Sequence, residues 1–251
     1  LMGKISKAVQ YMKHPLRTYS LISKWGWTRC LPDEIHLKIM YRALIGKNIN
    51  LDNPKGFNEK LNWLKLHDRN PLYNILVDKL AVKQWVADKI GAQYVSETYD
   101  SWDRVESISL ENLPEQFVLK TNHDSGGVAI CRDKSSFDFD AAKRVLRRHL
   151  KSNYFWWTRE WPYKDVTPMV MAEEYLEDEG FDTGLVDYKV TCFNGNPRLI
   201  EVHRGRFGEH TCNYYDQDWN PVTIDWAGIP VSPVEVERPE KLEKMLELSS
   251  V

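Results

Sequence analysis

Two lysines and a glycine-rich segment are the strongest candidates in this chain for residues that bind a ligand. Lys79 follows an aspartate at the start of a predicted helix, and Lys120 lies near the end of a β-rich run, residues 116–121. The next residues, 122–127, read Asn-His-Asp-Ser-Gly-Gly. Glycines let backbone N–H groups approach phosphate oxygens, and lysines supply the compensating charge. These residues therefore indicate a site for a polyphosphate.

The order of these features excludes two common nucleotide motifs. The lysine precedes the loop, and the loop leads into a second β run, residues 128–131, so a hairpin is predicted. In a Walker P-loop the loop opens a helix and the lysine follows it, and the dinucleotide motif Gly-x-Gly-x-x-Gly is absent here. Taken alone, Ser125-Gly126-Gly127 is also compatible with an ordinary hairpin turn.

Helices and strands are predicted around this hairpin. Apolar spacing predicts helices over residues 33–44, 58–66 and 78–90, a helix beginning at Asp140, and a last helix beginning at Arg238 with Pro239 in its first turn. Further strands are predicted over residues 168–176, 185–193 and 198–202. Asn194-Gly195 lies between the last two strands and predicts a tight turn. The mixture predicts an α+β fold.

Composition and charge narrow the class of protein. The chain has 251 residues, is 42% hydrophobic and has a net charge of -2, so bulk binding of nucleic acid is not expected. The four cysteines form no Cys-x-x-Cys pair, so neither a zinc motif nor a disulfide scaffold is predicted. No apolar run approaches the roughly 20 residues of a membrane helix, and no signal segment is visible. We expect a cytoplasmic protein with reduced thiols.

The basic N-terminus leaves one alternative open for this location. Six bases, from Lys4 to Arg29, precede the first acidic residue, Asp33. They are compatible with an amphipathic helix packed on the core, or with a peripheral contact to anionic lipid or glycan at the inner face of the membrane.

Three of these features occur in an informative order. Asp78-Lys79 is followed by residues 117–127 and then by an acidic, aromatic and apolar segment, residues 173–176. This order resembles the nucleotide site of ATP-grasp enzymes, and the chain resembles the TupA-like ATP-grasp family, named for teichuronopeptide synthesis. The matching stretches are 50–54, 57–65, 77–83, 117–127, 173–176 and 187–195. The resemblance implies an ATP-grasp fold with a helical region, 1–75, and two α+β lobes, 76–165 and 166–251, around a nucleotide cleft.

The resemblance also implies contacts to the phosphates of ATP. Lys79 and Lys120 would contact the α- and β-phosphates. A flexible lid would close over the phosphates, formed by His123, Ser125, Gly126 and Gly127. The plainer interpretation of Lys79 is a surface lysine on a helix.

The resemblance also implies contacts to the nucleoside of ATP. Glu173 would bind the adenine amino group, and the backbone of Glu174, Tyr175 and Leu176 would read the adenine edge. Asp187 would lie near the ribose. The plainer interpretation of Asp187 is an ion pair with Lys189 at the surface.

The chemistry implied by the resemblance is carboxylate activation with ATP and Mg²⁺. A carboxylate attacks the γ-phosphate to give an acylphosphate, and an amine then displaces phosphate to form an amide. Such a transfer depends on Mg²⁺ and positive groups more than on a protein nucleophile. The expected substrates are a uronic acid carboxylate of a surface or capsular polysaccharide and an amino acid or another small amine.

Three residues are candidates for handling these substrates. Arg206 and His210 match an arginine–histidine pair of the family and would bind the substrate or the transferred phosphate. Lys189 would reach the phosphates or the substrate carboxylate. The alternative for Arg206 and His210 is a polar surface loop.

The chain also departs from the family pattern. The Mg²⁺ ligands are expected on two late strands, with the patterns Arg-x-Asp and Gly-Glu-x-Thr, after a helix resembling residues 238–250. Neither pattern occurs before Val251. We therefore expect the C-terminal strands to be missing, the metal ligands to be unknown and turnover to be weak or absent. Asp187 and Glu201-Val202-His203 could mimic the metal pair, although the family order places them earlier.

Two other functions remain open. Asp216-Gln217-Asp218 has the form of the metal motif of a glycosyltransferase, although its aromatic neighbours favour a β-turn. A nucleotide-binding protein without chemistry is the second. A cluster of aromatic residues from Tyr154 to Tyr163 is compatible with a platform for stacking sugars or with packing in a core.

Overall fold

In a computed structural model, the structure describes residues 15–177, 185–206, 208–224 and 228–251. These residues mix helices with two antiparallel sheets, which confirms the predicted α+β class. The chain folds into two compact units. Unit 1 comprises Leu1–Trp85 and Val95–Glu174, and unit 2 comprises Val86–Tyr94 and Tyr175–Val251.

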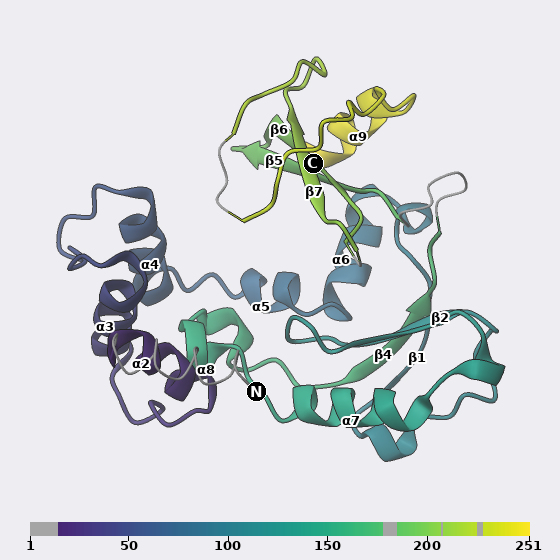
Figure 1. Ribbon diagram of the computed structural model, residues 1–251, viewed down its shortest axis with the longest axis horizontal. Coiled ribbons are helices and arrows are strands. Elements are labelled where there is room, and N and C mark those ends of the chain that lie inside the picture. The colour runs from purple at the N-terminus through teal and green to yellow at the C-terminus, as the bar shows by residue number, and fades with distance from the viewer. Residues whose placement is uncertain (1–14, 178–184, 207, 225–227) are drawn as a thin grey trace. The chain divides into compact units, whose positions relative to one another are not determined.

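The elements are labelled in Figure 1. The helices are α2 (Pro15–Lys24), α3 (Asp33–Ile45), α4 (Phe57–His67), α5 (Leu72–Val77), α6 (Ala81–Ile90), α7 (Phe139–Leu150), α8 (Phe155–Thr158) and α9 (Leu242–Ser249). The strands are β1 (Thr98–Trp102), β2 (Phe117–Thr121), β3 (Val128–Cys131), β4 (Val170–Glu174), β5 (Asp187–Phe193), β6 (Asn196–Arg204) and β7 (Thr211–Tyr215). Short 3₁₀ helices cover Ala92–Tyr94, Val105–Ser107, Lys134–Ser136 and Trp161–Tyr163.

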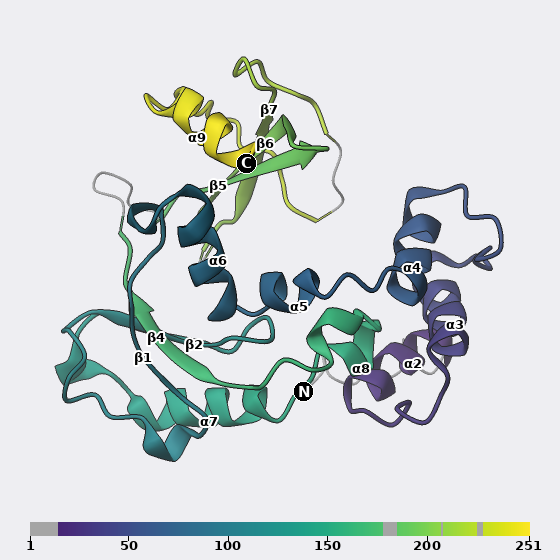
Figure 2. The ribbon, with the colours of Figure 1, turned by 180° about the vertical axis from the view of Figure 1, so that it is seen from behind.

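The sheet of unit 1 is antiparallel throughout and has the strand order β1-β4-β2-β3 (Figures 1 and 2). The predicted hairpin of β2 and β3 is confirmed, with Lys120 opposite Val128. Successive residues of a strand point to opposite faces, so Phe117 and Leu119 share one face and Lys120 lies on the other. The sheet thus separates an apolar face from a face that carries the lysine.

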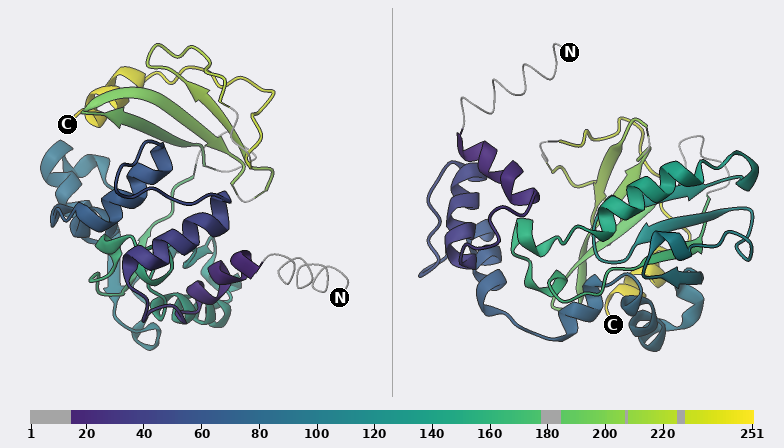
Figure 3. Two further views of the ribbon diagram at one scale, coloured as in Figure 1. Left: turned by 90° about the vertical axis from the view of Figure 1, so that its left-hand side faces the viewer. Right: turned by 90° about the horizontal axis from the view of Figure 1, so that it is seen from below.

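Helix α7 packs on the apolar face of this sheet (Figure 3, right). Its Leu146 is fully buried with Phe117 and Leu119. The helix begins at Phe139, one residue before the predicted start, because the Asp138 side chain accepts a hydrogen bond from the Ala141 amide and caps it. This core holds β2 and β4 rigidly beneath the lysine-bearing face.

The N-terminal helices α2 and α3 pack together, and α2 also contacts α8 (Figures 1 and 2). The residues that α3 buries are His36, Leu37 and Met40. His36 can be buried because its ring nitrogens bond to the Tyr19 hydroxyl and the Trp157 carbonyl. None of the described helices is both long and apolar enough to cross a bilayer.

Unit 2 contains a three-stranded antiparallel sheet with the order β5-β6-β7. Helix α9 packs against β5 and β6 (Figure 3, left). Its Leu242 is buried with Ile200 and Val202 in the core of this unit. The predicted turn between β5 and β6 is confirmed, with Asn194 and Gly195 both at positive φ.

Two predicted helix starts are wrong. The helix predicted from Asp78 begins at Ala81, because Asp78 and Lys79 form a turn pinned to Asn122. The helix predicted from Arg238 begins at Leu242, whose amide bonds to the Pro239 carbonyl in the preceding turn.

The division into units also differs from the predicted lobes. Strand β4 falls within the predicted second lobe, 166–251, yet it pairs with β1 and β2 and belongs to unit 1. Residues 86–94, placed by prediction in the first lobe, belong to unit 2. The difference arises because sheet pairing joins segments that are distant in sequence.

Candidate functional site

A cluster of charges lies on the lysine-bearing face of the sheet in unit 1. Glu173 of β4 pairs opposite Val118 of β2, so its side chain shares a face with that of Lys120. The Glu173 carboxylate forms ion pairs with Lys120 and, at 3.0 Å, with Lys83 of α6. All three side chains are largely buried. The structure therefore brings Lys120 and Glu173 together, as two members of one ionic cluster.

Sequence reasoning gave Lys83 no role. The sequence does contain a signal for Lys83. It lies four residues after Lys79, which is about one turn of a helix. The Lys83 ammonium also donates to the Ser96 carbonyl at 2.7 Å. Glu173 neutralises two lysines in this structure, and its contact to the adenine amino group remains a prediction.

Lys79 lies in the turn before α6 and is tied to the start of the glycine-rich loop. Its amide donates to the Asn122 carbonyl at 3.0 Å, and its ammonium donates to the Asp124 carbonyl at 2.5 Å. Asn122 is fixed in turn by a hydrogen bond from its side-chain amide to Asp78 at 3.0 Å. Burial lowers the pKa of Lys79; the Asp124 carboxylate opposes this shift and the charge of Lys120 adds to it. Lys79 is thus a half-buried loop residue, and its interpretation as a surface helix lysine does not hold.

The glycine-rich loop is anchored by Asp124, whose side chain points inward. Its carboxylate accepts hydrogen bonds from Thr121, from His149 at 2.5 Å and from Ser152 at 3.1 Å. Burial opposes ionisation of Asp124, but the hydrogen bonds from Thr121 and His149 outweigh it and hold the pKa of this carboxyl below its ordinary value. Asp124 therefore remains ionised and holds the loop against α7.

Gly126 and Gly127 are required for two different reasons. Gly126 has φ of 100°, in the left-handed region that favours glycine. At Gly127 a Cβ would collide with the Thr121 hydroxyl and lie 2.8 Å from the Cβ of His149. Ser125 and these two glycines line a cavity of about 340 Å³ together with Lys79. The other lining residues are Thr121, Asp124, Val128, Tyr154, Glu160 and Tyr163.

His123 is fully buried, although the sequence placed it in a flexible lid. Its Nε2 bonds to the Ser152 carbonyl at 3.0 Å, and its Nδ1 lies 3.2 Å from the Asn122 side-chain oxygen. Burial lowers its pKa, which favours the neutral ring. The structure places His123 behind the loop, where it supports the loop from inside unit 1.

The predicted adenine-reading segment follows the end of β4. Glu174 is the last residue of the strand, and its amide donates to the Glu97 carbonyl at 3.0 Å. Tyr175 and Leu176 belong to unit 2, and the Leu176 side chain is exposed. Their contacts to adenine remain predictions.

In unit 2, one face of the sheet packs on α9 and the other carries polar side chains. Asp187 pairs opposite His203, and His203 pairs opposite Cys212, so these three share a face. Lys189 pairs opposite Glu201 on the same face. The residues predicted for substrate handling thus lie beside potential metal ligands.

Asp187 gathers two of the predicted residues. Its Oδ2 accepts ion pairs from Lys189 at 3.0 Å and from Arg206 at 2.5 Å. The predicted Asp187–Lys189 ion pair is present, and Arg206 joins it. The side chains of all three are partly exposed, so the group is accessible to an anionic substrate.

His210 lies four residues after Arg206 and is held in place by another histidine. Its Nε2 lies 3.0 Å from Nδ1 of His203. Burial lowers the pKa of His210, and the neighbouring charges of His203 and Arg206 lower it further, so His210 is neutral at pH 7. Gly205 permits this turn, since it has φ of 64° and a Cβ there would collide with the Glu209 carbonyl. A neutral imidazole near Arg206 can accept a proton from an incoming amine.

Within the described residues, one group offers three close donor atoms for a metal, namely Glu201, His203 and Cys212. Mg²⁺ prefers oxygen ligands in octahedral geometry. A group with one carboxylate, one imidazole and one thiol does not fit that preference. The group that could hold a cation in unit 2 is therefore not the Mg²⁺ site expected from the sequence.

Other features singled out in the sequence have structural roles. Asp216 accepts hydrogen bonds from the amides of Asp218 and Asn220 at 2.9 and 2.8 Å, which makes it a turn-forming residue, as its aromatic neighbours indicated. In the aromatic cluster, Phe155 is buried in unit 1, whereas Tyr154 and Tyr163 line the cavity beside the glycine-rich loop. Of the basic N-terminal residues, those before Pro15 lie outside the described residues.

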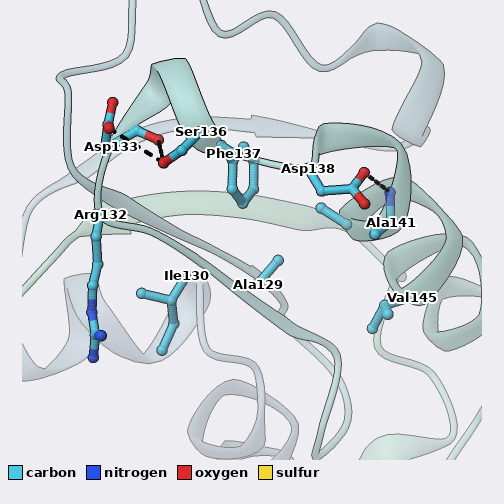
Figure 4. A pocket seen from close by; sticks show the side chains of 10 residues that line it. Ala129, Ile130, Arg132, Asp133, Ser136, Phe137, Asp138, Ala141 and Val145 are labelled. Carbon is cyan, nitrogen blue, oxygen red and sulfur yellow. Dashed lines mark hydrogen bonds between the residues drawn. The ribbon is translucent and has the colours of Figure 1, made fainter.

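A further cavity of about 600 Å³ lies at β3 and α7 (Figure 4). Its polar side chains serve local turns, since Ser136 donates to Asp133 at 3.3 Å and Asp138 caps α7. It contains none of the predicted site residues.

The comparisons with known proteins identified one family. The family profile described as TupA-like ATPgrasp matches residues 59–251, which include both lysines, the glycine-rich loop and the polar sheet face of unit 2. The chain matched no curated protein and no solved structure.

Proposed function

Because the chain belongs to the TupA-like ATPgrasp family, we propose that it is an ATP-dependent ligase that joins a carboxylate to an amine. Membership of this family supports ATP-dependent ligase activity. The finer proposal is that the carboxylate is a uronic acid of a surface or capsular polysaccharide and that the amine is an amino acid or a similar small amine.

The observation that carries the proposal is the gathering of three lysines near the glycine-rich loop of unit 1. Lys79, Lys83 and Lys120 lie close together, and among the described residues Glu173 forms ion pairs with two of them, whereas Asp78 and Asp124 lie near Lys79. Lys79 meets backbone carbonyls through its ammonium, which do not neutralise its charge. Partly buried charges need compensation. The phosphates of ATP would supply it, and the loop amides at Ser125 to Gly127 would add donors.

The proposed reaction has two steps. A carboxylate oxygen of the acceptor attacks the γ-phosphorus of ATP, and the bond from that phosphorus to the β–γ bridging oxygen breaks, which releases ADP and leaves an acylphosphate. The nitrogen of the amine then attacks the acyl carbon, and phosphate leaves with its electron pair. Arg206 would hold the acceptor carboxylate, and neutral His210 would take the proton that the amine loses. Family members generally use Mg²⁺, which would supply positive charge to the phosphates.

Binding is tested by the ATP-induced rise in melting temperature of the full chain. We expect ATP, but not UDP-sugars, to raise it, and Lys120→Ala to remove the shift. Lys143→Ala is a matched control, because Lys143 lies over the Phe139 ring on α7, away from the loop. An unchanged ATP shift in Lys120→Ala, or a shift with UDP-sugars alone, would contradict the proposal.

Chemistry is tested by trapping the acylphosphate. Hydroxylamine converts an acylphosphate into a stable hydroxamate, so incubation with ATP and an oligosaccharide of uronic acids should give an ATP-dependent hydroxamate by mass spectrometry. Arg206→Gln should lower its yield without changing the ATP shift. If ATP binds and no hydroxamate forms with any carboxylate tested, the chain is a nucleotide-binding protein without this chemistry.

A further inference from the structure

Three potential metal ligands of unit 2 come from two neighbouring strands. Glu201 and His203 are two residues apart on β6 and therefore point to the same face. Cys212 of β7 pairs directly opposite His203, which places its sulfur beside the imidazole. A carboxylate, an imidazole and a thiol thus converge without any recognisable spacing motif in the sequence.

The distances between the donor atoms fit a small tetrahedral site. Nε2 of His203 lies 3.2 Å from Oε2 of Glu201 and 3.8 Å from Sγ of Cys212. Bond lengths to zinc of about 2.1 Å for nitrogen and oxygen and about 2.3 Å for sulfur place tetrahedral ligand pairs about 3.4 and 3.6 Å apart. All three donor atoms lie within 4.8 Å of one another. The two pairs that include Nε2 of His203 are therefore within a few tenths of an ångström of these separations.

Neighbouring side chains orient these ligands, as the groups around the ligands of a metal site do. Nδ1 of His203 is engaged by His210 at 3.0 Å, which leaves Nε2 directed at Glu201 and Cys212. A ligating histidine usually has its second nitrogen bonded in this way. The Tyr214 hydroxyl is buried without a hydrogen bond of ordinary geometry, and the Cys212 thiol is the neighbour with which it interacts. That hydroxyl could donate to a metal-bound thiolate.

Without a metal, these side chains would form a less complete set of interactions. A hydrogen-bond network would join Glu201, His203 and His210, but it would leave the buried thiol with its neighbour Tyr214 and with contacts of 3.8 Å to His203 and 3.7 Å to the Asn213 carbonyl. His203 and Cys212 are both buried, so their donor atoms are removed from water. A shared cation satisfies the sulfur and the carboxylate together.

We propose that Glu201, His203 and Cys212 form a binding site for a divalent transition metal of the zinc class. Thiolate and imidazole favour Zn²⁺ or Co²⁺ over Mg²⁺. Three protein ligands leave a fourth position for water or for an oxygen of a substrate. The site lies wholly within unit 2 and does not depend on ATP binding or on the proposed ligase activity.

The test uses Co²⁺ alone, added to the full chain after treatment with a chelator. A cobalt–thiolate bond gives a charge-transfer absorption band in the near ultraviolet. We expect this band to saturate at one Co²⁺ per chain, to be displaced by Zn²⁺ and to persist in excess Mg²⁺. Absence of the band, or its loss in excess Mg²⁺, would overturn the proposal.

Variants assign the ligands. Cys212→Ser should abolish the band, and His203→Gln should weaken Co²⁺ binding at least tenfold. Cys192→Ser is the matched control, because Cys192 lies in the same sheet and its thiol donates to the Ser249 carbonyl. A band that survives Cys212→Ser, or that Cys192→Ser removes equally, would contradict the assignment.

A second measurement covers the case in which Cys212→Ser fails to fold. X-ray absorption at the zinc edge of the unmodified chain counts ligands without any substitution. We expect one sulfur and two or three nitrogen or oxygen ligands. A shell with no sulfur, or with two or more, would rule out this site.

Discussion

The polar side chains on the two sheets of this molecule differ in how tightly they are held. In unit 1 the groups near the glycine-rich loop are anchored, with Asp124 held by three hydrogen bonds and Glu173 by two lysines. In unit 2 the polar face exposes Asp187, Lys189 and Arg206. The first arrangement is rigid and gathers three lysines, which suits the proposed binding of phosphate. The second leaves groups accessible for a variable substrate.

The difference indicates where each kind of specificity is encoded. A triphosphate is the same in every catalytic cycle, so its site can be built from backbone and buried charges that need not move. The polar face of unit 2 combines a neutral His210 with an accessible arginine. The histidine suits proton transfer and the arginine suits anion binding, on a substrate that must enter and leave. Each prediction below tests this contrast between the two units, and the largest effect comes first.

The rigid packing of the glycine-rich loop predicts a large effect of Gly127→Ala. The new Cβ would collide with Thr121 and His149, so the loop or α7 must move, at a cost of about 3 kcal/mol in the free energy of unfolding. Urea denaturation measures this cost. Gly208→Ala is the control, because a Cβ at Gly208 has no atom within 4 Å. Equal stability of the two variants would show that the loop is not tightly packed.

The anchoring of Glu173 by two lysines predicts an intermediate effect of Glu173→Gln. Losing the shared carboxylate leaves Lys83 and Lys120 uncompensated and should lower the free energy of unfolding by about 2 kcal/mol. Inorganic tripolyphosphate should bind this variant more tightly, because the lysines become free for phosphate.

The same variant distinguishes two roles of Glu173. If Glu173 only neutralises the lysines, ATP and tripolyphosphate should gain affinity together. If it also binds adenine, ATP should gain less than tripolyphosphate, or lose. Calorimetric titration of both ligands separates these outcomes, and weaker binding of tripolyphosphate would contradict the ionic role.

Buried histidines in unit 1 predict a loss of stability on mild acidification. Burial lowers the pKa of His36 and His123, so the native state holds them neutral. As the pH falls below about 6.5, the unfolded chain takes up protons first, and stability falls by up to about 1.4 kcal/mol per pH unit for each histidine. The contribution is fully present above that pH and is lost as the pH falls through the native pKa.

His123→Gln should flatten this dependence in urea denaturation between about pH 7 and pH 5. Asp124 has a lowered pKa as well, but its contribution is lost only in more acidic solution, below its ordinary value of 3.8. An unchanged slope in His123→Gln would show that its ring is not held neutral in the native state.

The smallest effect is expected for Asp216→Asn in unit 2. Asp216 forms a turn through hydrogen bonds to backbone amides, and an asparagine oxygen can accept the same bonds. The melting shift with ATP should therefore equal that of the unmodified chain, and UDP-sugars should give no shift in either. A manganese-dependent UDP-sugar shift that Asp216→Asn abolishes would instead support a glycosyltransferase.

Much of the part that is proposed to bind phosphate could be predicted from the sequence. The β2–β3 hairpin, the glycine loop and Lys120 are local features, because turn chemistry and alternating burial act over a few residues. Lys79 was recognised by its order in the chain, but its turn was missed, since that turn depends on hydrogen bonds to Asn122, 43 residues away.

Other residues joined the site only through tertiary contacts. Lys83 reaches Glu173, and His149 of α7 anchors the loop through Asp124. His123, polar by type, is buried because Ser152 and Asn122 satisfy its ring. No local pattern encodes such pairings, because they require α6, α7 and the sheet to be packed first.

The sequence alone is enough to predict the α+β class, the order of Lys79, Lys120 and the glycine-rich loop, and the resemblance to the TupA-like family, because these depend on periodicity and on motif order. Only the tertiary structure decided which donors meet. Cysteines without a paired spacing gave no reason to expect a metal site, yet antiparallel pairing of β6 and β7 sets Cys212 beside His203 and Glu201. The physical reason is that strand register, and not spacing along the chain, places side chains on one face.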